Sequence, residues 1–487
     1  MSSIINSIRK TMRKDPNLDT DVKRMPMISW MFFLKALDDM EIEKKGKAEY
    51  SGKKFYPTID KPYRWRDWAA DESGITGDDL LKFVNSKLLP YLKGMTGGKN
   101  GGRDNIASIF MEVHNEARNG YLLRDAINQI NKIDFNASDD IHTLSHLYET
   151  MLKELRDAAG SNGEFYTPRP VVRFIVEMID PKIGEKVLDP AAGTCGFLVE
   201  ALFHLEKQIK SVEHRKTVYE ATLYGREKKP MPFLLGSMNM ILHGIDSPNY
   251  IRTNSLARNL NDITDKERVE VIITNPPFGG EEEESIQSGF PADKQTAETA
   301  LLFVQLIMRL LKRPNANKGI KGGRCGMVVP NGFLFGDGVC TRIKEQMLKE
   351  CNLHTIVRLP NGVFSPYTGI PSNLIFFEYG NKTEGIWFYE MPMPEYLKNG
   401  YTKTKPQKFE EYEPLAEWWK DREETEHAWF VKRAELDENL NLDLKNPNAP
   451  EGLASKPPEV LLANIAEKEK KIAKLISEIK TELEVRT

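Results

Sequence analysis

The stretch VIITNPPFGG, Val271 to Gly280, places an amide, two prolines and a phenylalanine directly behind a short apolar run that is typical of a buried strand. Proline has no backbone N–H to donate to a sheet, so we expect the strand to end here. Asn275 and Pro276 would present two carbonyl oxygens on a rigid backbone. Such acceptors suit an amino group on a planar conjugated ring, and Phe278 would stack on that ring. Most isolated Asn-Pro-Pro sequences are simple turns, but the strand and the aromatic residue favour a site.

A second candidate is VLDPAAGTCGF, where a strand ends in Asp189 and a loop of small residues leads into a helix beginning FLVEALF. Small residues let a ligand approach the backbone closely, and a helix N-terminus offers free N–H groups to an anion. A dinucleotide loop would need a third glycine beside Gly193 and Gly196. On this loop alone, a tight turn without a ligand is an equally good interpretation.

Two further stretches could belong to the same site. Glu227 ends the strand-like run ATLYGRE, at a position where an acidic side chain can bind ribose hydroxyls. In GEFYTPRPVV, Thr167 can cap a helix and Pro168 or Pro170 suits its first turn. The alternatives are a surface glutamate in a loop and a helix start with a hydrophobic anchor.

These stretches lie in a region where short β-rich runs alternate with helical patterns, from about residue 160 onward. The runs are EKVLDPAAG, ATLYGRE, PNYIRTNSL, VEVIITNPP, RCGMVVPNG and HTIVRLPNG. This alternation predicts an α/β fold with a doubly wound parallel sheet, whose ligands bind at the carboxyl ends of the strands. Asn275 would follow the fourth strand, beside the loop after Asp189.

The remaining chain divides by composition. We expect a helical N-terminal domain at 1–145, the α/β domain at 146–385, a polar region at 386–445, a linker rich in Pro and Asn at 446–458 and a helix at 459–487. In that helix the apolar residues Leu461, Ile465, Ile472, Ile476, Ile479 and Leu483 form a heptad-like seam. The seam could dock on a partner subunit or pack back on the N-terminal domain.

The bulk properties are those of a multidomain globular protein of 487 residues, with 40% hydrophobic and 29% charged residues. No apolar run approaches the roughly 18 residues of a membrane span. We expect no secretory signal at the N-terminus, where MSSIINSIRK has only a brief apolar patch. The four cysteines show no metal or disulfide spacing, which favours reduced thiols in the cytoplasm. A net charge of −3 does not indicate general binding of nucleic acids. If the protein binds DNA, it would do so through a local basic surface or a partner subunit.

Together and in this order, GEFYTP, DPAAGTCGF and NPPFG resemble the γ-class adenine-N6 DNA methyltransferases, and most closely the modification subunits of type I restriction–modification systems. The resemblance covers nearly the whole chain. It implies a Rossmann-like domain that uses S-adenosylmethionine, flanked by a helical N-terminal domain and a C-terminal helical extension. The implied reaction is direct methyl transfer to the N6 amine of an adenine flipped out of double-stranded DNA, with no metal and no covalent intermediate.

The resemblance also implies roles for residues. Asn275, Pro276, Pro277 and Phe278 would form the target-base pocket. Asp189, Ala191, Gly193 and Gly196 would hold the methionine part of the cofactor and Glu227 its ribose, while Asn254 stands where family members often have an aspartate for the adenine amino group. The implied cofactor-binding set is Glu164, Phe165, Tyr166, Thr167, Pro168, Asp189, Ala191, Gly193, Thr194, Gly196, Phe197, Glu227 and Asn254.

Sequence recognition would come from a separate specificity subunit bound by two copies of this chain, and a nuclease/translocase subunit would complete the complex. Phe364 and Tyr367 could line the base cleft, although buried packing is the simpler role. Glu281 to Glu284 are expected to form a mobile, solvated lid. The rival functions are methylation of cytosine N4 or of a protein glutamine amide, and a catalytically silent scaffold, against which the intact NPPF sequence speaks.

Overall fold

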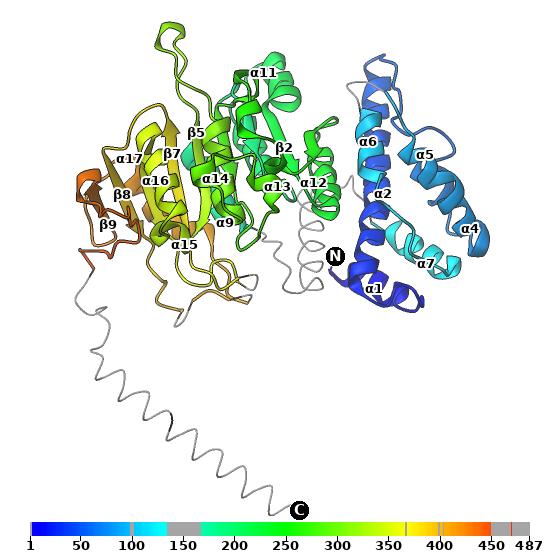
Figure 1. Ribbon diagram of the computed structural model, residues 1–487. Helices are drawn as coiled ribbons and strands as arrows, with labels where there is room; N and C mark the ends of the chain where they lie inside the picture. The colour runs from blue at the N-terminus through cyan, green and yellow to red at the C-terminus, as the bar shows by residue number, and fades with distance from the viewer. Residues whose placement is uncertain are drawn as a thin grey trace, which may run out of the picture.

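The computed structural model describes residues 2–97, 102–133, 167–365, 368–397, 400–402 and 404–449, together with Glu469. A helical N-terminal region stands beside a larger α/β region, and helix α12 (Pro230–Leu242) lies on the side of the α/β region that faces the helices (Figure 1). The predicted helix at 459–487 lies outside the described residues except for Glu469.

The N-terminal region is helical, as predicted. Its helices are α1 (Ser2–Met12), α2 (Asp21–Tyr50), α3 (Trp65–Trp68), α4 (Gly77–Phe83), α5 (Leu89–Lys93), α6 (Gly102–Phe110) and α7 (Gly120–Ile130), with a π-helical turn between α4 and α5. Helix α2 carries the apolar run ISWMFFLKAL, most of which is buried, and α1, α3 and α7 pack against it. Arg124 of α7 donates to the carbonyl oxygens of Trp68, Ala69 and Ile75, which closes the bundle.

The α/β region is built on one sheet with the strand order β3-β2-β1-β4-β5-β7-β6-β8-β9. The strands are β1 (Val187–Asp189), β2 (Leu223–Glu227), β3 (Asn249–Arg252), β4 (Val271–Thr274), β5 (Arg324–Pro330), β6 (Cys351–Arg358), β7 (Ser372–Tyr379), β8 (Gly385–Glu390) and β9 (Ala428–Lys432). The first five are parallel, as predicted, but β7 enters antiparallel between β5 and β6. Parallel neighbours need a long crossover, and no described helix separates β6 from β7.

The sheet also continues past residue 385, where the sequence becomes polar. Strand β8 pairs with β6, and β9 pairs with β8 at the edge. Helix α17 (Glu413–Lys420) lies between them in the chain, and its Leu415 and Trp418 join the apolar cluster on that face. Strands β8 and β9 are themselves rich in apolar residues, but a long polar stretch separates them in the chain, which is why composition did not reveal them.

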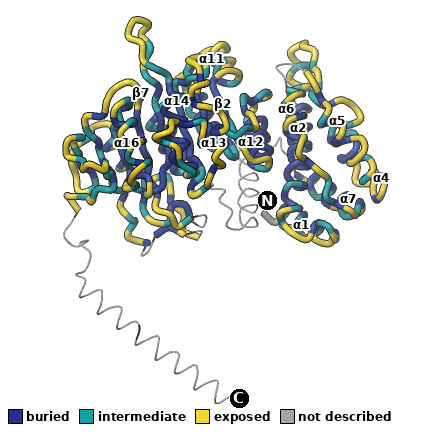
Figure 2. Tube along the Cα trace, viewed as in Figure 1, coloured by how far each residue is buried: buried dark blue, intermediate teal, exposed yellow. Residues whose placement is uncertain are grey.

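Helices cover both faces of the sheet, so the strands are buried between two layers (Figure 2). One face is covered by α9 (Arg169–Ile179) and α10 (Gly196–Glu206), and the other by α14 (Thr299–Leu310) and α16 (Val339–Glu350). The short helices α11 (Val212–Thr217), α13 (Glu284–Gln287) and α15 (Asn331–Phe335) lie in the connections.

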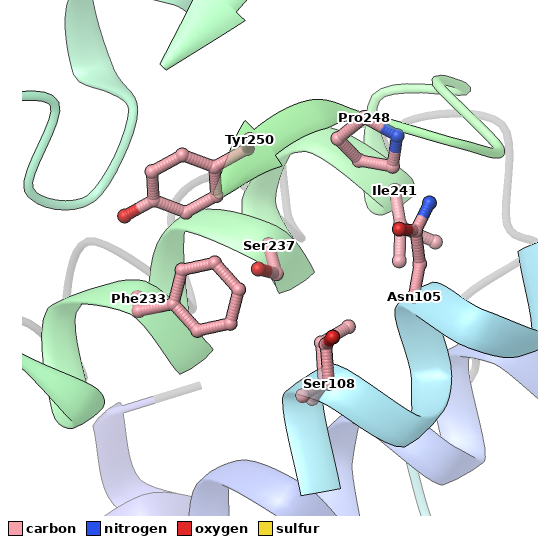
Figure 3. Close-up of a pocket in the computed structure, with 8 residues that line it drawn as sticks. Asn105, Ser108, Phe233, Ser237, Ile241, Pro248 and Tyr250 are labelled. Atoms are coloured by element: carbon pink, nitrogen blue, oxygen red, sulfur yellow. The ribbon is translucent and has the colours of Figure 1, made fainter. Parts of the chain in front are cut away.

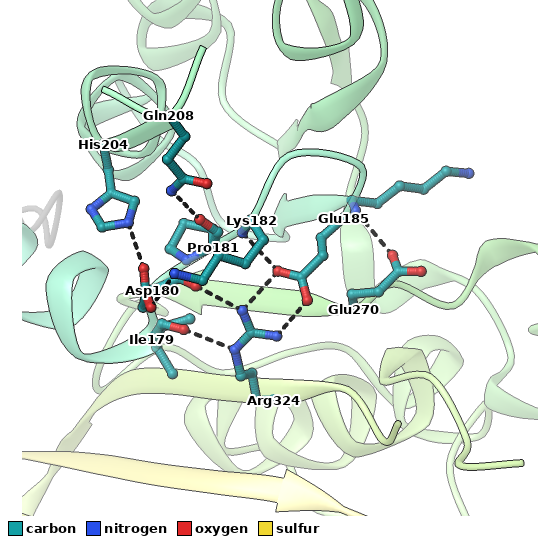
Figure 4. Close-up of polar contacts among 10 residues, drawn as sticks. Ile179, Asp180, Pro181, Lys182, Glu185, His204, Gln208, Glu270 and Arg324 are labelled. Carbon is teal, nitrogen blue, oxygen red and sulfur yellow. Dashed lines mark hydrogen bonds and ion pairs between the residues drawn. The ribbon is translucent and has the colours of Figure 1, made fainter. Parts of the chain in front are cut away.

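Arg324, at the start of β5, fixes α9 to the sheet (Figure 4). Its guanidinium donates to the carbonyl oxygens of Ile179 at 2.8 Å and Asp180 at 3.0 Å, and pairs with both carboxylate oxygens of Glu185 at 2.8 and 2.7 Å. Bidentate arginine pairs of this kind hold a defined geometry. The contact anchors the C-terminal end of α9 to the sheet. The N-terminal end of α9, next to Thr167, is thereby positioned at the edge of the sheet where the parallel strands end.

Candidate active site

The candidate residues gather where three neighbouring parallel strands end. Asp189 is the last residue of β1 and Glu227 the last of β2, while Asn275 directly follows β4. Strand β1 pairs with β2 on one side and with β4 on the other. The predicted placement of Asn275 after the fourth strand, beside the Asp189 loop, is confirmed.

Asp189 links the end of β4 to the loop that follows β1. Its Oδ1 accepts a hydrogen bond from the Thr274 hydroxyl at 2.6 Å and another from the backbone N–H of Ala191 at 3.1 Å. The side chain is only 1% exposed. Burial, aided by the negative charge of Glu227, raises its pKa to about 7. At neutral pH a carboxyl with this pKa is only partly ionised, and a nearby cation would favour its charged form.

The loop at 190–196 is held in shape from outside. The Tyr250 hydroxyl donates to the Gly193 carbonyl at 2.7 Å, and Asn239 Nδ2 of α12 donates to the Thr194 carbonyl at 2.9 Å. Cys195 adopts a left-handed φ of 61°, a strained conformation for a residue with a side chain. The loop is therefore preorganised, and it leads directly into the N-terminus of α10.

Helix α12 brings the N-terminal region close to this loop. A small pocket separates α6 from α12 and β3, and Figure 3 shows Phe233, Ser237 and Tyr250 on one side of it with Asn105 and Ser108 on the other. Ile109, Ile241 and Pro248 complete its lining. The same helix thus faces the helical region on one side and the candidate cofactor loop on the other.

Glu227 is fixed at the end of β2 by backbone donors. Its carboxylate accepts the N–H of Gly193 at 3.0 Å and the N–H of Lys229 at 2.8 Å. A carboxylate only accepts hydrogen bonds, which suits the hydroxyl donors of a ribose. This placement, between the cofactor loop and the start of α12, suits the predicted role in ribose binding.

Asn275 has one satisfied and one unsatisfied polar atom. Its Nδ2 donates to the Thr167 hydroxyl at 2.9 Å, which orients the amide. Its Oδ1 is buried and has no hydrogen-bond partner among the described residues. An unsatisfied buried carbonyl is costly, which makes it a marker of a site that a donor can fill. The amide thus keeps an acceptor ready for an N–H group.

Phe278 is too deeply buried to stack on a base, the role predicted for it, without a rearrangement. It is 5% exposed and belongs to the apolar cluster of the sheet, and Pro276 beside it is also buried. For Phe278 to stack on a base, its side chain or the groups that cover it must move. Phe364 is buried in the same cluster, and Tyr367 lies outside the described residues.

Asn254 and the acidic loop lie together. Asn254, just after β3, accepts the Leu256 N–H through Oδ1 and donates through Nδ2 to Glu282 at 3.3 Å. Glu282 also pairs with Lys228 at 3.0 Å and is 9% exposed. The expectation of a solvated lid is therefore wrong for Glu282, although Glu281, Glu283 and Glu284 are exposed.

The other predicted residues fall into three groups. Pro168, Ala191 and Gly196 are half-buried around the loop, with Gly196 accepting a hydrogen bond from Arg169. Phe197 lies in the hydrophobic core, so its side chain is not available to a ligand. Glu164, Phe165 and Tyr166 lie outside the described residues.

Sequence reasoning missed the supporting residues. Thr274, Asn239 and Tyr250 position the loops, and only Thr274 carried a signal, as a polar residue at the end of an apolar strand. The four cysteines are buried and unpaired, and burial raises the pKa of the Cys195 and Cys325 thiols. Within the described ranges, no cluster of His, Cys, Asp or Glu could hold a metal ion, and no helix could span a membrane.

Comparison with known proteins identifies the family. The N-6 DNA Methylase model matches residues 139–453, and the HsdM N-terminal domain model matches residues 1–130. The chain belongs to the N-6 DNA methylase family. Its sequence is 46% identical to the type I restriction enzyme EcoEI methylase subunit of Escherichia coli, over 95% of this chain and 93% of that protein. The EcoKI methylase subunit of the same species is 30% identical over 78% of the chain.

Solved structures agree with this family. A chain described as a modification subunit of a type I restriction enzyme from Vibrio vulnificus matches with a TM-score of 0.87 and 52% identity, over 93% of this chain and 98% of that one. A second, from a study of complex assembly and conformational transition of a type I restriction–modification system, matches with a TM-score of 0.76 and 40% identity over the whole chain and 99% of its own length. The predicted methyltransferase fold and adenine-N6 DNA methyltransferase class are confirmed.

Proposed function

We propose that this member of the N-6 DNA methylase family transfers a methyl group from S-adenosylmethionine to the N6 amine of adenine within a specific DNA sequence, as the modification subunit of a type I restriction–modification complex. The observation that carries the proposal is the buried Oδ1 of Asn275, which has no hydrogen-bond partner in the part of the chain that the structure describes, beside a preorganised cofactor loop. The family of the chain and its type I relatives support the same conclusion.

The residues around the loop fit S-adenosylmethionine. A Cβ atom added at Gly193 would meet no heavy atom of the described residues within 4 Å, so there is space beside the loop at this position. Asp189 would face the cationic methionine end and Glu227 the ribose hydroxyls, with Thr167, Pro168, Ala191, Thr194, Gly196 and Asn254 around them. The cofactor supplies an electrophilic methyl group on a sulfonium. Glu164, Phe165 and Tyr166 keep their proposed contacts with it, and Phe197 would contribute through its backbone.

Asn275 would act on the target amine. The lone pair of an adenine amine is delocalised into the ring, which makes it a weak nucleophile. Acceptance of one amine hydrogen by Asn275 Oδ1 and of the other by the Pro276 carbonyl would favour a pyramidal nitrogen with a free lone pair. Thr167 holds the Asn275 amide in the orientation that this role requires, and Pro277 keeps the backbone rigid. Phe278 would stack on the flipped base once it is uncovered.

The assembly would follow that of type I systems. We propose that two copies of the chain bind one specificity subunit through the helix at 459–487, that residues 446–458 serve as linker, and that a nuclease/translocase subunit joins the complex on double-stranded DNA. Residues 1–145 would form the helical domain and 146–385 the catalytic domain, with 386–445 completing the sheet edge. The cytoplasm, where DNA and reduced thiols are found, is the compartment this function implies.

The test is methyl transfer in the presence of the specificity subunit. The full complex is incubated with tritiated S-adenosylmethionine and duplex DNA, and the DNA is hydrolysed to nucleosides. We expect the label in N6-methyladenine at a defined site. Label in N4-methylcytosine, or in protein glutamine, would support a rival substrate, and bound cofactor without transfer would support a silent scaffold.

A further inference from the structure

The segment after β9 returns across the sheet to the edge that carries the candidate site. Strands β4, β5, β6 and β8 all end at this edge, whereas β9 starts there and runs away from it to Lys432. Arg433 then donates to the carbonyl oxygen of Leu348, near the end of α16, at 2.9 Å. From there residues 436–448, here called the tail strap, run back along α16 toward the site.

Hydrogen bonds and apolar packing hold the tail strap along its length. The hydroxyl of Thr341, in the first turn of α16, donates to the Asn439 carbonyl at 3.2 Å. The Leu442 N–H donates to the Leu334 carbonyl at 2.9 Å, and the Leu442 side chain is fully buried. The other leucines of the strap pack against the apolar cluster that contains Leu442: Leu436, Leu440 and Leu444. The strap is therefore part of the folded α/β region.

Asp443 ties the strap to the edge of the sheet beside the candidate site. Its carboxylate pairs with Arg358, the last residue of β6, and accepts a hydrogen bond from Asn331 Nδ2 at 3.1 Å. Asn331 directly follows β5, and β5 is the neighbour of β4, which leads into Asn275. The strap thus reaches the strand next to the predicted target-base pocket.

Two asparagines fix the last residues of the strap at the same edge. Asn446 Nδ2 donates to the Glu426 carbonyl at 2.8 Å, and Asn448 Nδ2 donates to the Thr425 carbonyl at 3.0 Å, both just before β9. The described chain leaves the α/β region beside β9 (Figure 1). Only ten residues, 449–458, then precede the predicted C-terminal helix, and ten residues span at most about 35 Å.

We propose that the tail strap positions the specificity subunit, carried by the C-terminal helix, beside the target-base pocket, and that Asp443 is the positioning residue at its end. The inference rests on the proposed assembly through that helix. Without the strap, the free tether would start at the opposite edge of the sheet and grow from residues 449–458 to residues 433–458. The effective concentration of a tethered partner falls with about the −3/2 power of tether length, which gives a loss of about 4-fold. Loss of direction adds to this, so released chains should transfer methyl groups about 4- to 10-fold more slowly.

The first test lengthens the tether and leaves the strap intact. About 20 Gly and Ser residues are inserted after the exposed Ala449, and the matched control carries the same insert after Lys318, in an exposed turn at the opposite edge. Methyl transfer is measured in a single turnover by each chain assembled with the specificity subunit. The insert after Ala449 should slow transfer about 5-fold, with full stoichiometry and unchanged affinity for S-adenosylmethionine, and the control should keep the normal rate. Equal rates of the two chains would overturn the inference.

The second test releases the strap. Leu442→Ala combined with Asp443→Ala removes its buried side chain and its ion pair, and Glu438→Ala changes an exposed residue of the same segment as the control. Amide hydrogen exchange across 436–448 should quicken only in the double variant, and its transfer should slow about 4- to 10-fold while assembly and cofactor affinity stay intact. Asp443→Asn keeps the side-chain shape and should change both readouts in the same direction, which protects the test if the double variant is unstable.

Two results of the second test would contradict the role of the strap. These are fast exchange across the strap with a normal rate of transfer, and unchanged exchange in the double variant. Failure of the unmodified chain to bind the specificity subunit would instead count against the proposed assembly.

Discussion

The Asp189 carboxyl combines almost complete burial with hydrogen bonds from Thr274 and Ala191, its two donors among the described residues. Its pKa of about 7 in the folded chain, against 3.8 for the ordinary group, means that the folded state binds the proton more strongly than the unfolded state. Its charge therefore costs stability, increasingly as the pH rises from about 4 to 7. A residue kept at such a cost is expected to serve ligand binding.

We therefore predict opposite effects of Asp189→Asn on stability and on binding. The asparagine oxygen can still accept from Thr274 and Ala191, so the variant should match the unmodified chain at pH 4. At pH 8 it should be more stable by a few kcal/mol, since each pKa unit corresponds to about 1.4 kcal/mol. Affinity for S-adenosylmethionine should fall. Denaturant unfolding at both pH values and titration of the cofactor check this; equal stability differences at both pH values would contradict it.

At the scale of elements, α12 acts as a template for the cofactor loop. A Cβ atom at Gly236 would lie 2.8 Å from the Gly193 carbonyl oxygen and 2.9 Å from Cys195 Sγ, closer than such atoms can approach. The loop can therefore reach its shape only against a helix with glycine at this position. Asn239, one turn later on the same helix, then fixes the Thr194 carbonyl.

Gly236→Ala should accordingly displace the loop, with a loss of stability of about 1–3 kcal/mol and a clear loss of cofactor affinity. Gly46→Ala is the matched control, because Gly46 also lies within a helix but has nothing within 4 Å of its Cβ position. The control should be neutral or stabilising by up to about 1 kcal/mol. Thermal unfolding and cofactor titration of both variants measure these effects. Equal changes of stability and affinity in the two variants would refute the role of α12 in shaping the loop.

The elements of the site were largely predictable from sequence, whereas the contacts between them were not. Apolar runs that end in Asp189, Glu227 and Asn275 mark strand ends directly, because polar residues and prolines stop a buried strand. The burial of Glu282 was not predictable from sequence, since four consecutive glutamates are typical of a solvated loop. Its burial depends on Lys228 and Asn254, which only the folded chain brings near. Strands β8 and β9 were missed for a different reason, because a long polar stretch separates these two short apolar strands in the chain.

At the scale of the whole molecule, α12 belongs to two cores. Its residues Leu234, Leu235, Met238 and Ile241 join the apolar cluster of the N-terminal region, while Phe233 and Met240 join that of the sheet. Lys44 and Asn105 of the N-terminal region also contact the turn after α12, through Asp246 and Ser247. A shift of the helical region would thus be felt at the cofactor loop.

Leu235→Ala should test this coupling. It removes a buried side chain from the shared helix and should cost about 2–5 kcal/mol of stability, together with a loss of cofactor affinity. Leu123→Ala is the matched control, because Leu123 is equally buried in the N-terminal cluster but lies on α7. Both variants should be destabilised, and only Leu235→Ala should bind S-adenosylmethionine more weakly. A similar change of affinity in both would argue against a specific role for α12.

Assembly is a second property of the whole molecule. Truncation after about Lys456 removes the heptad-like seam from Leu461 to Leu483. A lone helix cannot bury such a stripe, so we expect a folded, cofactor-binding chain that no longer co-purifies with the specificity subunit. Pull-down with the tagged specificity subunit measures this. Full stoichiometry after truncation would show that assembly lies elsewhere, and failure to fold would favour packing of the helix on its own chain.

The most direct test of the central claim is the rate of methyl transfer by Asn275→Ala, measured in a single turnover with the specificity subunit and its DNA. The account predicts a loss of about 10²–10³ in rate, with affinity for S-adenosylmethionine unchanged, because Asn275 Oδ1 acts on the amine and not on the cofactor. Thr167→Val, which removes the hydroxyl that orients the Asn275 amide, should lose less. Near-normal transfer by Asn275→Ala would contradict the account.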